Sequence, residues 1–234
     1  MAAATLAVYR TSIGKKFLMA ITGIIGYLFV IAHMVGNLKI FLGADALNHY
    51  SAFLRTVGEP IFPARTLLWI MRIVLLASVI IHVAMAIQLS RQAQTSRPTG
   101  YRKKQSVQAN FASLTLRWGG TAIFFFLIFH LLHFTFGSAL PGFRELNDNG
   151  IVHPDAYHNV ILGFSNPLSV LIYLVAVAAL GMHLYHGVWS LFQTLGINRP
   201  HLDGLFRGLA VLSGVGLFAG FAVVPLAVLF GFLK

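Results

Sequence analysis

The sequence contains no cysteine in its 234 residues. This absence excludes disulfide bonds, iron–sulfur ligation by this chain, zinc thiolate sites and the covalent C-x-x-C-H attachment of haem. Charged residues are also scarce, at 10% of the chain, and only 6 of them are acidic. A metal bound by this chain must therefore be held by nitrogen or oxygen, and its 10 histidines are the obvious candidates.

Apolar residues dominate the remaining composition. The chain is 57% hydrophobic with a mean hydropathy of +0.78, which is more apolar than a soluble domain of this size. The net charge of +11 is also typical of nucleic-acid binding. However, the basic residues lie between apolar segments, and that arrangement is typical of membrane topology. The composition therefore indicates a membrane protein.

Five apolar segments are long enough to cross a ~30 Å hydrocarbon layer as helices rising ~1.5 Å per residue. We predict transmembrane helices at residues 17–38, 67–89, 114–136, 168–192 and 205–233. The first segment is too long for the apolar region of a secretory signal. The fold class is therefore an all-α membrane protein, with one five-helix domain over residues 1–234. Lys and Arg are concentrated in the segments that share a side with the N-terminus, which predicts a cytoplasmic N-terminus.

Histidines occur inside the first four predicted helices: His33 in the first, His82 in the second, His130 and His133 in the third, and His183 and His186 in the fourth. An ionisable side chain in hydrocarbon is costly and indicates a functional role, although a single histidine can also serve as a hydrogen-bonded contact between helices. Two facing imidazoles from different helices are the axial ligands of a low-spin b-type haem. Four helices that each carry one therefore predict two such haems.

Haem propionates also need cationic partners. Arg72 lies about one turn inside the second predicted helix, where a buried guanidinium requires an acidic partner such as a propionate. Arg117, at the start of the third helix, is a second candidate. Most other basic residues near helix ends are expected to anchor those ends at the membrane interface.

Four motifs occur in order along the chain. Two belong to the first predicted helix, one to the third and one to the fourth. They are TSIGKKFLMAITG at 11–23, H-M-V-G-N at 33–37, R-x12-H from Arg117 to His130, and H-x3-G-x-W-S from His183 to Ser190. Together they resemble the single-chain, five-helix, di-haem cytochrome b subunit of succinate dehydrogenase and fumarate reductase. The resemblance implies that His130 rather than His133, and His183 rather than His186, is the haem ligand.

The resemblance further implies the partners and cofactors of this chain. Members of this family anchor a flavoprotein subunit and an iron–sulfur subunit at the bacterial cytoplasmic membrane, and they pass electrons between the iron–sulfur subunit and a quinone. The complex links the tricarboxylic acid cycle to the respiratory chain, and menaquinone fits the di-haem type. We expect the partner subunits to dock on the basic inner face, including residues 97–104. Ser12, Lys15 and Lys16 are candidate contacts for quinone or for a propionate.

Depth in the membrane predicts how the four ligands pair. At ~1.5 Å per residue, His33 and His130 lie ~24 Å from the inner surface, whereas His82 and His183 lie ~10–14 Å from it. Because both ligands of one haem must share a depth, we expect His33 with His130 at an outer haem and His82 with His183 at an inner haem. Two other functions remain open: the cytochrome b subunit of a hydrogenase or formate dehydrogenase, and a cofactor-free transporter or proton channel with histidine relays.

Overall fold

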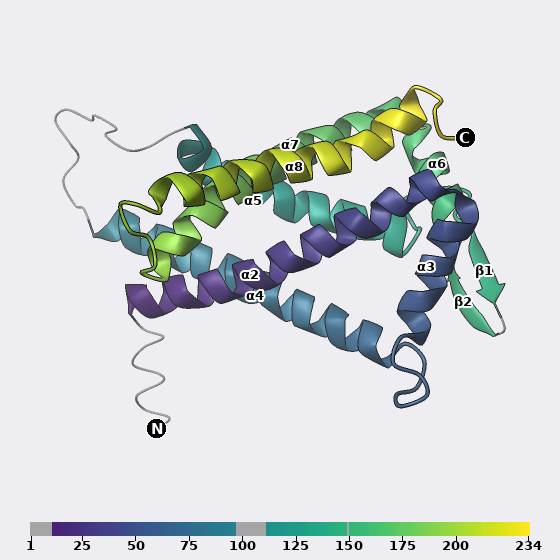
Figure 1. The fold of residues 1–234 in the computed structure, drawn as a ribbon, viewed down its shortest axis with the longest axis horizontal. Coiled ribbons are helices and arrows are strands. Elements are labelled where there is room, and N and C mark those ends of the chain that lie inside the picture. Colours follow the sequence, from purple (N-terminus) through teal and green to yellow (C-terminus); the bar gives the residue numbers. More distant parts are fainter. Residues whose placement is uncertain (1–10, 97–110, 149) are drawn as a thin grey trace.

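The computed structural model describes residues 11–96, 111–148 and 150–234. Five long helices form a bundle and are long and apolar enough to cross a membrane (Figure 1), as the sequence predicts. They are α2 (Ser12–Leu38), α4 (Thr66–Thr95), α5 (Phe111–His130), α7 (Pro167–Thr194) and α8 (Asp203–Leu229). The chain is thus a multi-pass membrane protein with an essentially helical fold.

Local sequence signals account for several helix boundaries. The side chain of Thr11 accepts a hydrogen bond from the Gly14 amide and so caps the first turn of α2. Asn166 caps α7 in the same way, and Pro167 occupies the first helical position. At the other end of the chain, α8 stops at Leu229 instead of continuing to residue 233. Gly231, whose φ is +75°, ends it in the left-handed conformation typical of helix C-termini.

The third transmembrane helix also departs from its expected form. Instead of continuing as an α-helix to residue 136, α5 ends at His130 and is followed by a π-helical turn, Leu131–Thr135. In such a turn each amide bonds to a carbonyl five residues back, so the side chains are rotated relative to an α-helix. This rotation changes the direction of His133.

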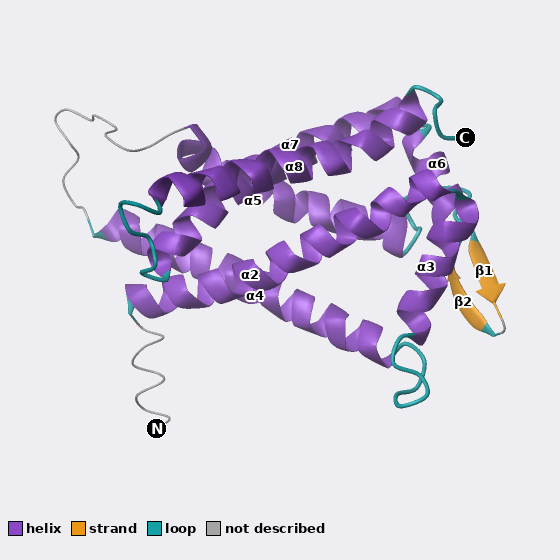
Figure 2. Ribbon diagram, viewed as in Figure 1, coloured by secondary structure: helices purple, strands orange, loops and turns teal. Residues whose placement is uncertain are grey.

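The two long connections form a compact cap over one end of the bundle (Figure 2), which the sequence did not predict. The cap consists of a 3-10 turn (Lys39–Leu42), helix α3 (Ala44–Thr56), strands β1 (Glu145–Asp148) and β2 (Ile151–Pro154), and helix α6 (Ala156–Phe164). The two strands pair as an antiparallel hairpin, with Leu146 opposite His153. They are a small departure from the all-α expectation, and α3 packs against both β2 and α6.

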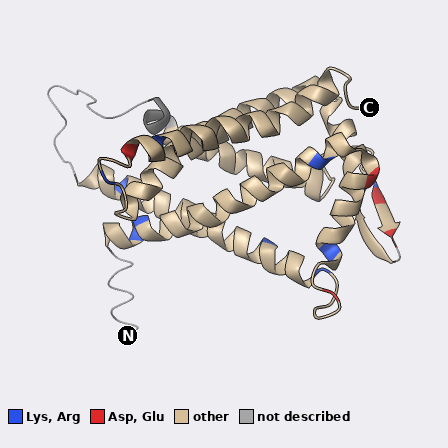
Figure 3. Ribbon diagram, viewed as in Figure 1, with Lys and Arg blue, Asp and Glu red and all other residues tan. Residues whose placement is uncertain are grey.

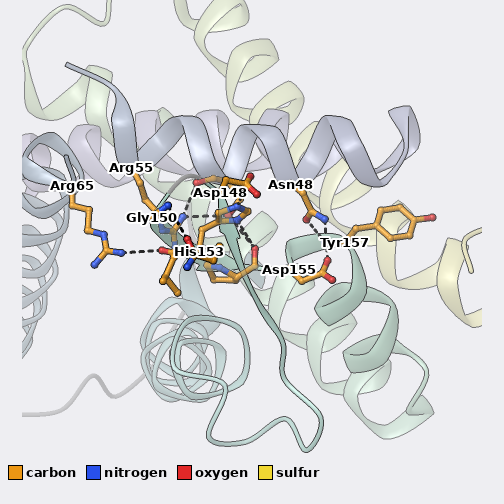
Figure 4. Close-up of polar contacts among 12 residues, drawn as sticks. Asn48, Arg55, Arg65, Asp148, Gly150, His153, Asp155 and Tyr157 are labelled. Carbon is orange, nitrogen blue, oxygen red and sulfur yellow. Dashed lines mark hydrogen bonds and ion pairs between the residues drawn. The ribbon is translucent and has the colours of Figure 1, made fainter. Parts of the chain in front are cut away.

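Polar contacts hold the cap together (Figure 4). Asn48 of α3 donates to Asp155 Oδ1 at 3.0 Å and accepts from the Tyr157 amide at 3.1 Å, which fixes the start of α6. Arg65 Nη2 donates to the carbonyl oxygen of Val152 at 3.1 Å. His153 is 1% exposed and lies 3.0 Å from a carboxylate oxygen of Asp148. The most deeply buried apolar cluster, which includes Ile40, Phe164 and Val170, also lies at this end.

The outer surface of the bundle is apolar. On α4, Ile73, Leu76 and Ile80 are 62%, 62% and 59% exposed, and their spacing places them along one side of the helix. Charged residues of the described part gather mostly at the two ends of the bundle (Figure 3). An exposed apolar belt between two charged ends is the surface expected of a protein surrounded by lipid.

The helices pack as two groups. Helices α7 and α8 are in close contact, α5 packs on α7, and α2 packs on α4. Gly181 and Gly214 allow the close approach of α7 and α8, because a Cβ on Gly214 would lie 2.7 Å from the Gly181 carbonyl oxygen. Among the described residues the two groups meet mainly where α2 touches α7 and α8, and α4 makes few contacts with α5 or α7.

Candidate functional site

Two pairs of histidines bridge the two helix groups. On the side of the cap, His33 of α2 and His130 of α5 have ring centroids 5.8 Å apart and an interplanar angle of 78°. Farther from the cap, His82 of α4 and His183 of α7 have centroids 6.2 Å apart at 59°. We call them the cap-side pair and the far pair. These are the same partners that depth suggests from the sequence, whereas their role as metal ligands stays a prediction.

The separation of the rings suits one metal ion held between two imidazoles. Two metal–nitrogen bonds of ~2 Å, together with about 1 Å from each ring nitrogen to its centroid, give a centroid separation of roughly 6 Å. No group of three or more His, Asp or Glu side chains in the described part of the chain is arranged to hold a metal ion. Each pair can thus supply two axial ligands, and a macrocycle such as a porphyrin would have to supply the others.

The four paired histidines are not fully covered by the protein. His33, His82, His130 and His183 are all only partly buried although they lie well inside the bundle, whereas His133 is 2% exposed. Glycines lie beside both rings of the far pair. A Cβ on Gly23 would lie 3.5 Å from His82 Cε1, and a Cβ on Gly120 would lie 3.8 Å from His183 Cε1. The residues present therefore fit a haem at each pair.

Hydrogen bonds orient one ring of each pair. His82 Nδ1 lies 3.1 Å from the carbonyl oxygen of Met19 and 3.3 Å from the hydroxyl of Thr22. A proton on Nδ1 is donated to that carbonyl, which leaves the Nε2 lone pair available for a metal. Thr22 Oγ1 is itself 2.8 Å from the Leu18 carbonyl, to which it donates. In the cap-side pair, His130 Nδ1 lies 3.1 Å from the hydroxyl oxygen of Tyr173.

His133 and His186 each lie one turn from a paired histidine, but in the described part of the chain neither ring faces a histidine of another helix. His133 contacts aromatic rings, including Phe129 at a centroid distance of 5.1 Å, and its Nδ1 lies 3.2 Å from the Tyr173 hydroxyl. His186 Nδ1 is buried and has no hydrogen-bond partner within the described chain, and the same holds for His183 Nδ1. Among the described residues, ring contacts across the helix groups therefore involve His130 and His183 and not their neighbours.

The predicted propionate partners lie apart from each other. The guanidinium of Arg72 stacks on the ring of Trp69 at 4.9 Å, and Arg117 Nη1 donates to Ser90 Oγ at 3.3 Å near the end of α4. In the cap, burial and the like charges of Arg72 and Arg65 lower the pKa of Arg55. Three like charges, Arg55, Arg65 and Arg72, thus act on one another near the cap end of α4, and Glu145 of β1 offsets part of their repulsion.

The predicted quinone contacts lie on the first turn of α2, at the end of the bundle away from the cap. Ser12 and Lys16 are exposed and Lys15 is partly buried. The next turns of α2 carry Met19 and Thr22, which contact His82. Residues 97–104, the predicted docking segment, lie outside the described residues.

Sequence reasoning missed an apolar cavity between α2, α7 and α8. Its volume is about 430 Å³, and its lining includes Ile31, Val188 and Leu212. Tyr27 and Ser213 place their hydroxyl oxygens 2.6 Å apart at its wall. Ser213 Oγ also lies 2.7 Å from the Leu209 carbonyl and donates to it, so Tyr27 donates to Ser213. The cavity lies outside the two histidine pairs.

Comparisons with models of known families, with curated proteins and with solved structures gave no match to this chain.

Proposed function

We propose that this chain is the di-haem membrane anchor of a succinate:quinone oxidoreductase, and that it passes electrons between an iron–sulfur subunit and a quinone. The observation that carries the haem assignment is the presence of two interhelical histidine pairs whose rings are 5.8 and 6.2 Å apart. The succinate-specific part of the proposal rests on the sequence motifs from Thr11 to Ser190. The bacterial cytoplasmic membrane is the proposed location.

Each pair would hold one b-type haem, and haem bound there would supply one-electron transfer. The chain would contribute the imidazoles that hold each group: His33 and His130 at an outer haem, on the side of the cap, and His82 and His183 at an inner haem. The Met19 carbonyl holds the ring of His82 in one tautomer, and the Tyr173 hydroxyl orients His130.

Charged residues at the bundle ends would serve the ligands and partners. Arg72 and Arg117 are the proposed cationic partners of the propionates, because a guanidinium pairs well with a carboxylate. Ser12, Lys15 and Lys16 are proposed to contact quinone or a propionate near the inner surface. The flavoprotein and iron–sulfur subunits would dock on the inner face beside them.

Two measurements on the purified protein test the proposal. A pyridine haemochrome assay on a fully loaded preparation should give two b-type haems per chain. A preparation without haem would instead favour a transporter or channel with histidine relays. Copurification of a flavoprotein that oxidises succinate separates this proposal from the cytochrome b subunit of a hydrogenase or formate dehydrogenase, which would bring a different partner.

A further inference from the structure

A tyrosine joins two histidines at the cap-side pair. Tyr173 of α7 is 6% exposed, and its hydroxyl oxygen lies 3.1 Å from His130 Nδ1 and 3.2 Å from His133 Nδ1. A phenol has one proton to donate, so Tyr173 can donate to only one of these nitrogens and must accept from the other. The three groups therefore form a chain with a defined direction.

The ligand role of His130 sets that direction. If Nε2 of His130 binds a metal, Nδ1 carries the proton and donates it to the Tyr173 oxygen. Tyr173 then donates to His133 Nδ1, which must be the unprotonated nitrogen of that ring. The order is His130 Nδ1–H to Tyr173, and Tyr173 O–H to His133. Hydrogen bonds arranged head to tail polarise one another, so the bond to His130 is stronger than an isolated one.

The backbone brings His133 into this chain. The π-helical turn starts at Leu131, directly after His130, and turns of this kind often occur at functional sites. Helix α6 then holds the ring in place: a Cβ on Gly163 would lie 3.1 Å from His133 Cε1 and 2.7 Å from the ring of Phe134. His133 is thus a fixed acceptor, buried at 2% exposure, and has little room to rotate away.

We infer that Tyr173 and His133 are positioning residues that orient His130 and increase the electron density on its iron-binding nitrogen; this inference rests on the proposed haem function. A strongly hydrogen-bonded Nδ1–H makes an imidazole a more basic ligand. A more basic axial ligand favours the oxidised iron and lowers the reduction potential. His82 bonds to a backbone carbonyl instead, so replacing Tyr173 or His133 should change only the cap-side haem.

The test is a redox titration of the haem absorption bands in the membrane-bound protein and in three variants. Tyr173→Phe should retain both haems and raise the potential of the component that His130→Ala removes. We expect an increase of about tenfold in its ratio of reduced to oxidised haem, which is 59 mV for a one-electron couple. His133→Phe should shift the same component in the same direction by less, because Tyr173 still accepts from His130. Tyr27→Phe is the matched control, since it also removes a hydroxyl inside the bundle but one that bonds Ser213.

Electron paramagnetic resonance of the oxidised protein adds a second readout, because a reoriented His130 ring changes the g-values of the same haem. Equal shifts in Tyr173→Phe and Tyr27→Phe, or no shift in either readout for both Tyr173→Phe and His133→Phe, would overturn the inference and leave the proposed function intact. Loss of one haem in His133→Phe would identify His133 as the ligand and also overturn it. A wild-type protein without haem would overturn the proposed function and the inference together.

Discussion

The backbone carbonyl of Met19 lies 3.1 Å from Nδ1 of His82, so a residue of α2 orients a histidine of α4. The contact joins the two helices at the depth where His82 faces His183. A histidine whose Nδ1–H bonds to a backbone carbonyl presents Nε2 to a metal, and this is the usual arrangement of histidine ligands in proteins. The packing of α2 on α4 therefore fixes the orientation of the His82 ring in the far pair without any cofactor.

The pairing of the histidines predicts which substitutions act on the same haem. His33→Ala and His130→Ala should each remove the same spectral component, and His82→Ala and His183→Ala should each remove the other one, because one axial ligand is lost in every case. Reduced-minus-oxidised spectra of membranes from each variant measure this. His186→Ala is the control and should retain both components. Loss of one shared component in His33→Ala and His82→Ala would contradict the pairing.

The close contact of α7 and α8 predicts a strong effect at one glycine. Gly214→Ala places a methyl group 2.7 Å from the Gly181 carbonyl oxygen, so the two helices must separate. Overpacking of this kind costs about 1–3 kcal/mol, and the thermal unfolding temperature in detergent should fall. The control is Gly208→Ala on the same helix, because a Cβ there would meet no described residue within 4 Å, and this variant should unfold like the wild type. Equal unfolding temperatures for the two variants would contradict the contact.

The hairpin of the cap depends on one buried histidine. Nδ1 of His153 lies 3.0 Å from the Pro154 carbonyl oxygen, and Nε2 lies 3.0 Å from Asp148 Oδ2. Both partners are acceptors, so a ring nitrogen that carries a proton can donate to either of them. His153→Leu removes both hydrogen bonds and leaves the Pro154 carbonyl with fewer partners. The free energy of unfolding of the cap should fall by about 1–3 kcal/mol.

Limited proteolysis measures this effect directly. Cleavage within residues 145–154 should be faster in His153→Leu than in the wild type. His49→Leu, at an exposed position of α3, is the control and should be cleaved at the wild-type rate. Identical cleavage of all three proteins would show that the bonds of His153 do not hold the hairpin.

The basic segment between α4 and α5 is predicted to bind the partner subunits. Replacing Arg102, Lys103 and Lys104 together with Glu reverses the charge that would attract them, so less flavoprotein and iron–sulfur subunit should copurify with the chain. Both haem spectra should stay normal, which serves as the internal control. Succinate-driven quinone reduction that survives the triple reversal at moderate salt would mean that this segment only sets the membrane topology.

The sequence alone determined the five membrane helices, because an apolar run of ~20 residues crosses a membrane as a helix and backbone groups inside hydrocarbon have few other ways to bond. It also suggested His33 with His130 and His82 with His183 as partners, since depth follows from the constant rise of a helix. Only the tertiary structure decided the rest. The cap, its hairpin and the π-helical turn after His130 depend on contacts between distant segments, as in the bond from Asn48 to Asp155. No sequence pattern marks Tyr173, because it is a single tyrosine in an apolar helix. Only the packing of α5 on α7 places its hydroxyl between two histidines.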